Sequence, residues 1–211
     1  MARIGIFGTS GFAREVDDVA SELGLEAVYI AVNATERDAW PYEEEVILEE
    51  EVGRYADMPF VIGIGDNAVR KRVAERFLGQ LRFATLVHPA ATFGKRQRAR
   101  IEERRGVVVG AGARFMSNVE VGDFAFFDLN STVGHDSIVG SYAHLAPGAN
   151  VSGHVDIGER VWIGTGAAVN QGQAGRRLAI GAGTVIGSGA VVVADCDADA
   201  VYAGVPARRI Q

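Results

Sequence analysis

A six-residue repeat in the second half of the chain constrains the fold more than any other feature. Stepping by six from Val109 to Val169 meets an apolar residue at all eleven positions, far more regularly than a 48% hydrophobic composition gives by chance. Glycine follows the apolar residue at six of these steps, and the period then shifts and restarts at Ile180. Such a period with apolar–glycine steps is typical of a hexapeptide β-helix.

Each hexad supplies one short strand and one turn, and three hexads close a triangular coil. Residues eighteen apart therefore stack about 4.8 Å from one another in neighbouring coils. The repeated Val, Ile or Leu points inward, and stacking buries a continuous column that no single coil would bury alone. The glycine after it suits a corner where a side chain would crowd the backbone.

Residues 1–85 have a different pattern, in which apolar runs alternate with helical spacing. The expected elements are the strands Arg3–Phe7, Ala27–Val32 and Phe60–Ile64 and the helices Phe12–Leu23 and Asn67–Leu78. This alternation predicts a small parallel sheet covered by helices, an α/β domain of Rossmann-like βαβ type. We expect that domain over residues 1–85 and the β-helix with a C-terminal tail over residues 86–211. The acidic stretch Asn33–Asp57 is expected to be irregular.

Composition and charge exclude several classes of protein. A net charge of −6 gives no general case for a nucleic-acid partner. One cysteine, Cys196, excludes an internal disulfide framework and fits a reducing compartment. The chain opens without a signal-peptide pattern, and no apolar run approaches 18 residues. We therefore expect a cytoplasmic protein with no transmembrane segment.

The turn Gly8–Gly11 leads from the first expected strand into the first helix. Such a turn points backbone N–H groups at an anion and places the positive helix end behind it. Ser10 and Ala13 stand where the dinucleotide fingerprint has glycine, and Asn33 stands where it has an acidic residue. A standard dinucleotide cofactor is therefore not expected. A nucleotide-diphosphate site and a turn without a ligand both fit the pattern.

A second strand-to-helix turn, Gly63–Asn67, is expected at the same edge of the sheet. Asp66 would cap the following helix and do nothing more. Alternatively, Asp66 and Asn67 would face the nucleotide.

Three of the four histidines, His135, His144 and His154, lie in the repeat but off the inward column. Gly153 follows His135 by eighteen residues, so the neighbouring coil places no side chain over that imidazole and leaves room for a substrate. His154 follows Asp136 by eighteen residues, which makes these two candidates for contact. No tight spacing of His, Cys and Glu supports a metal site, and no metal is expected. A surface histidine without a role is the alternative for His135.

Two stretches interrupt the hexads and carry arginines. Residues 95–105 are strongly basic, and a solvated, irregular first coil is favoured there over contact with a substrate phosphate or a neighbouring subunit. The loop Asn170–Ala179 contains Arg176 and Arg177, which would meet CoA phosphates or lie free in solvent. Arg208 near the C-terminus presents the same choice.

Four segments together with the repeat carry a resemblance to a known family; they are Ile6–Val16, Gly134–Asp136, Ala143–Ala149 and Val201–Ile210. The chain resembles the hexapeptide-repeat acyltransferases. Within them it is similar to the branch that contains the nucleotide-sugar N-acetyltransferases of bacterial glycan synthesis and the sialic acid O-acetyltransferases. The resemblance implies a left-handed parallel β-helix and a homotrimer, with acetyl-CoA in the groove between adjacent β-helices.

The resemblance also implies catalytic roles for His135 and Asp136. An amine that attacks a thioester must lose a proton, and an imidazole with an ordinary pKa of about 6.5 accepts one at neutral pH. Asp136 would hold the tautomer of His135 only if the pair sits at a corner, because consecutive strand residues point opposite ways. Otherwise His154 is the expected partner of Asp136. Direct transfer is expected, since Cys196 lies away from the histidines.

The resemblance extends to the substrate sites. Acetyl-CoA, as co-substrate, is expected to contact His144, Gly153, Thr165, Ser188 and Arg208. The nucleotide sugar is expected to contact Gly8, Thr9, Ser10, Gly11, Asn33, Asp66 and Asn67. The predicted function is acetyl-CoA-dependent N-acetylation of a nucleotide-linked amino-deoxy-sugar, such as a UDP- or GDP-4-amino-4,6-dideoxy sugar. Sugar O-acetylation of the sialic acid type and a non-catalytic nucleotide-sugar-binding scaffold are the alternatives.

Overall fold

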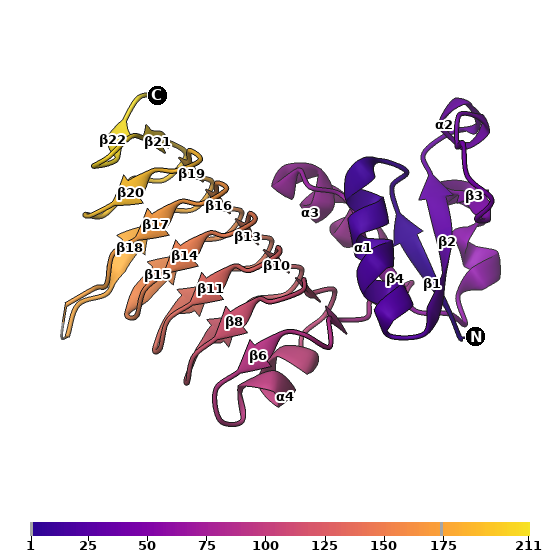
Figure 1. Cartoon of the computed structure of the whole chain (residues 1–211). Coiled ribbons are helices and arrows are strands. Elements are labelled where there is room, and N and C mark those ends of the chain that lie inside the picture. Colours follow the sequence, from indigo (N-terminus) through magenta and orange to yellow (C-terminus); the bar gives the residue numbers. More distant parts are fainter. Residues whose placement is uncertain (1, 174) are drawn as a thin grey trace.

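The computed structural model describes residues 2–173 and 175–211 and places an α/β unit beside a long stack of β-coils (Figure 1). The strands of the α/β unit are β1 (Ala2–Phe7), β2 (Leu25–Ala31), β3 (Val46–Leu48) and β4 (Phe60–Ile62). Its helices are α1 (Gly11–Glu22), α2 (Ala34–Asp38), the 3-10 helix η1 (Glu49–Tyr55) and α3 (Asn67–Phe77). The strands form a parallel sheet in the order β3-β2-β1-β4, which confirms the predicted Rossmann-like arrangement. Within the described residues, none of the helices is both long and apolar enough to cross a membrane.

The prediction that the stretch Asn33–Asp57 is irregular is wrong. It contains α2, β3 and η1, and Ile47 of β3 pairs with Ile30 of β2. Strand β3 has only three residues, so it is too short to show an alternating pattern. Its pairing with β2 gives the sheet its fourth strand.

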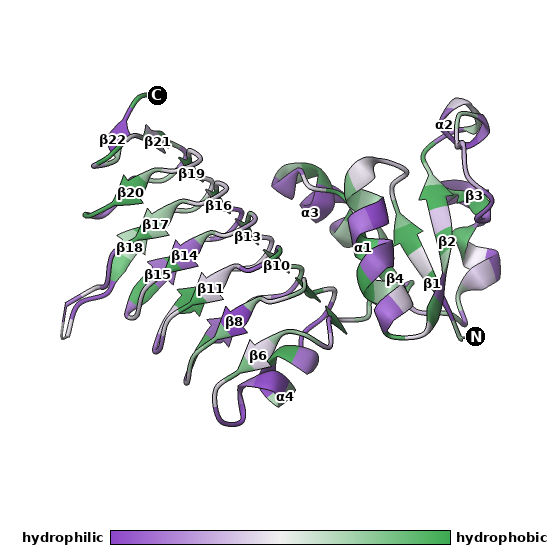
Figure 2. Ribbon diagram, in the orientation of Figure 1, coloured by the Kyte–Doolittle hydropathy of each residue, from purple (hydrophilic) through white to green (hydrophobic). Residues whose placement is uncertain are grey.

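Helix α1 packs against both the sheet of the α/β unit and the β-coils. One of its sides buries Ala13 and Val16 against the sheet, in the apolar cluster that also contains Phe126 from the β-coils. Hydrophobic and hydrophilic residues lie in separate bands along this helix (Figure 2). The α/β unit therefore shares a core with the β-coils through α1.

The β-coils form three sheets, which we name faces I, II and III. Face I consists of β5 (Leu86–Val87), β7 (Val108–Val109), β10 (Phe126–Phe127), β13 (His144–Leu145), β16 (Trp162–Ile163), β19 (Val185–Ile186), β21 (Val201–Ala203) and β22 (Arg208–Arg209). Face II consists of β6 (Thr92–Phe93), β8 (Arg114–Phe115), β11 (Thr132–Val133), β14 (Asn150–Val151), β17 (Ala168–Val169) and β20 (Val191–Val192). Face III consists of β9 (Glu120–Val121), β12 (Ile138–Val139), β15 (Val155–Ile157) and β18 (Leu178–Ile180).

The predicted stacking is confirmed by the strand register. Val133 pairs with Val151, eighteen residues on, and this spacing recurs around the prism up to the insertion after Val169. All eleven inward residues of the frame from Val109 to Val169 are at most 5% exposed. The apolar column is therefore the core of a parallel β-helix.

Two different backbone features form the corners of the coils. Where glycine follows the inward residue, it allows close approach between coils: a Cβ on Gly134 would lie 2.4 Å from the backbone nitrogen of Gly153. The third residue after the inward one takes a left-handed conformation, as Asn118, Asp136 and His154 do at the corner between faces II and III. This conformation reverses the usual alternation of side chains.

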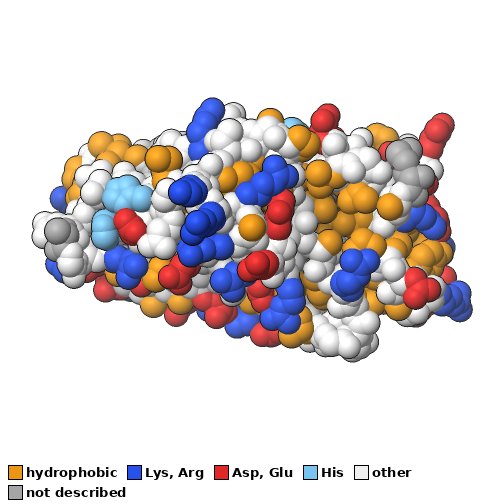
Figure 3. Space-filling view, turned by 90° about the horizontal axis from the view of Figure 1, so that it is seen from below, with side chains coloured by type: hydrophobic (Ala, Val, Ile, Leu, Met, Phe, Trp, Pro, Cys, Tyr) orange, Lys and Arg blue, Asp and Glu red, His pale blue; other side chains and the backbone are white. Residues whose placement is uncertain are grey.

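Helix α4 (Gln97–Glu102) covers the N-terminal end of the β-helix, so the expectation of an irregular first coil is wrong. The side chain of Gln97 bonds to both the N–H and the carbonyl of Val119, and Ile101 is 1% exposed. The first coil has no coil beneath it, so another apolar element must close its core. The basic side chains of this stretch point outward and gather on the surface at that end (Figure 3).

Arg70 of α3 fastens the α/β unit to the β-helix. Its guanidinium is 1% exposed and donates to the carbonyl oxygens of Phe124 (3.0 Å), Ile64 (2.9 Å) and Tyr142 (2.8 Å). Burial lowers the pKa of Arg70 to about 10, so the group stays charged at neutral pH. A buried charge with all its donors satisfied fixes how the two parts meet.

Candidate active site

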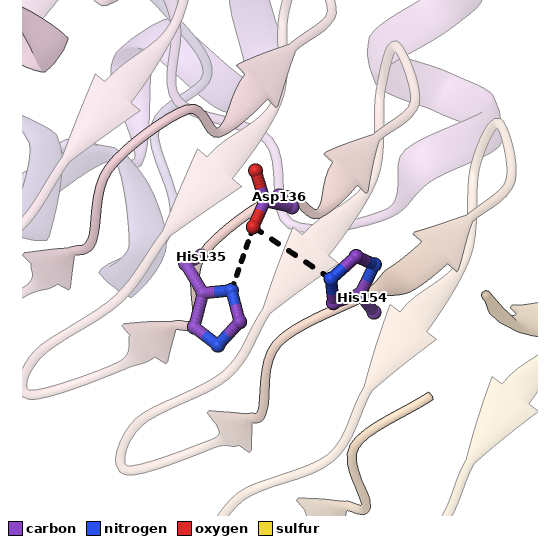
Figure 4. Close-up of side chains that lie close together, drawn as sticks. All are labelled: His135, Asp136 and His154. Atoms are coloured by element: carbon purple, nitrogen blue, oxygen red, sulfur yellow. Dashed lines mark hydrogen bonds and ion pairs between the residues drawn. The ribbon is translucent and has the colours of Figure 1, made fainter. Parts of the chain in front are cut away.

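His135 and Asp136 form a hydrogen-bonded pair at the corner between β11 and β12 (Figure 4). The distance from His135 Nδ1 to Asp136 Oδ2 is 2.7 Å. Consecutive strand residues would point apart, but Asp136 has a φ of 57°, which turns its side chain toward its neighbour. The corner condition is therefore met, and both side chains are accessible, at 47% and 35% exposed.

Asp136 is held from the coils on both sides. Asn118 donates to its Oδ1 at 2.8 Å, and His154 Nε2 lies 3.7 Å from its Oδ2. The hydrogen bond from Asn118 and then that from His135 lower the pKa of Asp136, so the group is a carboxylate at neutral pH. An ionised carboxylate only accepts hydrogen bonds, so Nδ1 of His135 carries the proton and Nε2 is left as a base. His135, and not His154, is the closer partner of Asp136.

The imidazole of His135 lies against Gly153, which corrects the expectation that this glycine leaves room for substrate above the ring. A Cβ on Gly153 would stand 2.6 Å from His135 Nε2 and 2.8 Å from Cε1. The missing side chain therefore accommodates the imidazole itself. Within residues 2–173 and 175–211, the Gly153 N–H has no hydrogen-bond acceptor.

His135, Asp136 and His154 are close enough to offer a metal three ligand atoms, all within 4.8 Å of one another. Two ligands of one tetrahedral zinc ion stand about 3.3 Å apart, given bond lengths of about 2.0–2.1 Å. The 2.7 Å between His135 and Asp136 is shorter than that and suits a shared proton. The absence of a metal stays a prediction.

His144 lies on face I, away from the corner that holds His135. It is 5% exposed, its Nε2 lies 2.8 Å from Asp128 Oδ2, and its Nδ1 lies 3.3 Å from the carbonyl oxygen of Gly65. Helix α1 covers this part of face I, so a position off the inward column is nevertheless buried. One chain therefore does not bring His144 and His135 together, and the contact of His144 with acetyl-CoA stays a prediction.

The predicted nucleotide-sugar residues follow the carboxyl ends of β1, β2 and β4, at one edge of the sheet. Gly8 has a φ of 112°, and a Cβ there would lie 3.0 Å from the carbonyl oxygen of Gly63. Ser10 is the N-cap of α1, but its side chain makes no capping hydrogen bond and is exposed. The N-terminus of α1 is therefore open to an anion.

Other residues at this edge have structural partners. Asn33 caps α2 by accepting from the N–H of Glu36 at 3.0 Å, and Asp66 caps α3 by accepting from Val69 at 2.8 Å. The side-chain amide of Asn67 donates to the carbonyl of Arg160 on the β-helix at 3.0 Å. Their contacts with a nucleotide stay predictions.

Glu36 is a further candidate for the nucleotide-sugar site, and the sequence pattern did not reveal it. Its carboxylate accepts from the hydroxyl of Thr9 and from the N–H of Val32 at 2.8 Å. A dinucleotide-type pattern has its acidic residue at the position of Asn33, and Glu36 lies three residues beyond that position, in α2. The acidic group at the end of β2 is thus present, displaced by one helical turn.

Comparisons with known proteins agree with this geometry. Residues 3–77 match the family model of the PglD N-terminal domain. Over 176 residues the chain is 29% identical to the GDP-perosamine N-acetyltransferase of Escherichia coli O157:H7, covering 80% of this chain and 78% of the relative. Among solved structures it is similar to the acetyltransferase domain of PglB from Neisseria gonorrhoeae FA1090 in complex with acetyl coenzyme A (TM-score 0.85, 25% identity, 99% and 98% of the two chains covered). It is also similar to PerB from Caulobacter crescentus in complex with CoA and GDP-perosamine (TM-score 0.83, 26% identity, 100% and 98% covered).

The chain is a hexapeptide-repeat acetyltransferase. The N-terminal match and the full-length structural matches together cover both parts of the chain. The resemblance inferred from the motifs is thereby confirmed.

The predicted acetyl-CoA residues of this acetyltransferase are spread over the β-helix. Gly153 lies at the corner between faces II and III, whereas Thr165 and Ser188 are exposed at the corner between faces I and II. Arg208 is exposed on β22, near the C-terminal end of face I. Arg177 in the insertion donates to the Asp136 carbonyl at 3.1 Å, which ties that loop to the site. In one chain these residues do not line a common groove.

Proposed function

We propose that this enzyme transfers the acetyl group of acetyl-CoA to the amino group of a nucleotide-linked amino-deoxy-sugar. The observation that carries the proposal is the exposed His135–Asp136 pair, on a β-helix similar along its whole length to PerB with CoA and GDP-perosamine. The PglD-type N-terminal domain offers the open N-terminus of α1 for a diphosphate.

His135, Asp136 and Gly153 support direct transfer of the acetyl group from acetyl-CoA to the amine. The neutral amine attacks the thioester carbonyl, a C–N bond forms, and the carbonyl oxygen becomes an oxyanion near the Gly153 N–H. Nε2 of His135 takes a proton from the new ammonium group while Asp136 stabilises the imidazolium. The C–S bond then breaks, the sulfur leaves as thiolate and takes the proton from His135. The products are the amide and free CoA, and the histidine returns to its neutral form.

We infer that the working unit is a homotrimer with face II turned to the threefold axis. Met116 and Val193, 56% and 45% exposed, lie along one edge of face II, and Leu129, 51% exposed, lies along the other. Apolar side chains at both edges of one face favour packing against further copies. In that arrangement the edge with Thr165 and Ser188 meets the edge with His135 of the next protomer.

The same arrangement supports an active site shared between protomers. The α/β unit packs on face I, which in a closed trimer faces the next protomer's corner between faces II and III. The turn Gly8–Gly11 of one protomer and His135 of the next would then serve one substrate. Light scattering that gives a monomer mass at assay concentration would contradict this proposal. Because acetyl-CoA is a cytosolic metabolite, we place the reaction in the cytoplasm.

The test is release of free CoA thiol from acetyl-CoA with purified acceptors. GDP-perosamine comes first, since two relatives are named for it or bind it, followed by UDP-linked 4-amino sugars and by sialic acid. We expect turnover with a nucleotide-linked amine and a fall in kcat of about 100- to 10,000-fold in His135→Ala. His88→Ala is the matched control, because the one hydrogen bond that the His88 side chain makes to residues 2–173 and 175–211 is accepted by its Nδ1 from the N–H of Ala90, at the start of the β-helix. Full activity of His135→Ala would overturn the role of His135 as the base. Turnover with sialic acid alone would show that the enzyme is an O-acetyltransferase and not an N-acetyltransferase.

A further inference from the structure

Four polar residues spaced by eighteen form a column along the corner that holds the base. They are Arg100, Asn118, Asp136 and His154. The last three have nearly identical left-handed backbones, with φ values of 61°, 57° and 56°. Equal spacing and equal backbone geometry place their side chains directly above one another.

Asn118 occupies one oxygen of the Asp136 carboxylate and leaves the other for the base. Its Nδ2 donates to Oδ1 of Asp136 at 2.8 Å, while His135 Nδ1 lies 2.7 Å from Oδ2. With Asn118 in place, the plane of the carboxylate is set by two partners on different atoms. His154 approaches the same Oδ2 at 3.7 Å and therefore competes with His135 if the carboxylate rotates.

The orientation of the Asn118 amide is set in turn by Arg100. A guanidinium has only donors, so the side-chain oxygen of Asn118 faces it, at 3.4 Å from Nη1, and the amino group faces Asp136. Arg100 belongs to the basic stretch over α4, for which the sequence offered no defined role. The column thus runs from the helix that closes the β-helix to the catalytic pair.

We propose that Asn118 is a positioning residue of the acetyl transfer, holding Asp136 so that His135 keeps its proton on Nδ1 and presents Nε2 to the amine. The proposal rests on the function proposed above. The Asp136 side chain is 35% exposed, so without the amide it is free to turn toward His154 or solvent, and the tautomer of His135 loses its constraint. Arg100 acts one step further away by keeping the amide in the required orientation.

The test compares Asn118→Gly with Asp199→Gly. Asp199 has a similar left-handed backbone (φ 51°), but it lies on the corner between faces III and I, away from the edges of face II, and is exposed. Glycine accepts this conformation, so both variants keep the fold and lose only a polar side chain. Asn118→Asp is the second variant, since it keeps the shape of the side chain but cannot donate.

We expect kcat to fall about tenfold in Asn118→Gly and further in Asn118→Asp, with the KM for acetyl-CoA within about twofold of the wild type. Nitrogen-15 NMR of the imidazole should show a single Nδ1–H tautomer of neutral His135 in the wild type and in Asp199→Gly, and a tautomer mixture in both Asn118 variants. Unchanged kcat and an unchanged tautomer in both Asn118 variants would overturn the proposal. A wild type that releases no CoA with any amino sugar would instead overturn the proposed function, while the tautomer measurement would still decide the role of Asn118.

Discussion

The imidazole of His135 rests on the backbone of Gly153, one coil further along the β-helix. A Cβ on Gly153 would lie 2.6 Å from Nε2, the atom that we propose as the base. The ring is 47% exposed and ends a flexible side chain, so an added methyl group displaces the imidazole rather than the backbone. The position of the imidazole that we propose as the base therefore depends on this glycine.

Gly153→Ala should reduce kcat by about 10- to 100-fold, because displacements of about 1 Å in a catalytic group have effects of this size. The melting temperature should change little, since the imidazole can swing into solvent. Gly53→Ala is the control, because nothing lies within 4 Å of a Cβ at that position. Wild-type kcat in Gly153→Ala would show that the ring need not lie on this glycine.

Arg70→Met should destabilise the protein by about 3 kcal/mol or more. The change leaves the carbonyl oxygens of Phe124, Ile64 and Tyr142 without a donor in a buried junction. Arg72→Met, an exposed change on the same helix, should stay within about 0.5 kcal/mol of the wild type. Urea denaturation measures both, and equal midpoints for the two variants would contradict the role of Arg70.

Cys196 should resist alkylation in the folded protein. Burial first, and then the neighbouring Asp195 and Asp197, raise the pKa of its thiol from 9.0 to about 11. A higher thiol pKa means less thiolate at any pH below it, so at pH 8 iodoacetamide should react about 100-fold more slowly than with the urea-unfolded chain. Rapid labelling of the folded enzyme, or loss of activity on labelling that acetyl-CoA prevents, would contradict direct transfer without a cysteine.

Dialysis against EDTA should leave kcat unchanged. The 2.7 Å separation of His135 and Asp136 suits a shared proton and not two ligands of one metal ion. The measurement is CoA release before and after dialysis, with added Zn²⁺ or Mg²⁺ as the comparison. Activity that disappears with EDTA and returns with one of these ions would require a metal at His135, Asp136 and His154.

The periodic features of the chain could be predicted because they depend on local spacing. The hexads gave the inward column, the eighteen-residue register and the approach of His154 to Asp136. Strand β3 and helix α4 could not be predicted in this way. Both are short elements, and they form because a neighbouring sheet edge or an open coil end needs to be covered.

The residues of the candidate site likewise divide into those that local spacing predicts and those that it does not. The pairing of His135 with Asp136 was predicted only on the condition of a corner, and the left-handed backbone of Asp136 is what meets it. Glu36 meets Thr9 across 27 residues, and no local pattern indicates that contact. The eighteen-residue spacing places Asn118 beside Asp136, but no motif in the sequence marked Asn118 as a functional residue.

By itself, the sequence determined the β-helix and the α/β unit and indicated His135 as the base that we propose, because a repeat buries its core through spacing that is written in the chain. Only the tertiary structure decided that His144 is buried against Gly65, 79 residues away, and that Arg70 joins α3 to the β-helix. These contacts arise from the docking of two separately patterned parts, whose complementary surfaces appear only after each part has folded. For the same reason, the partner of Asp136 depended on a single backbone angle.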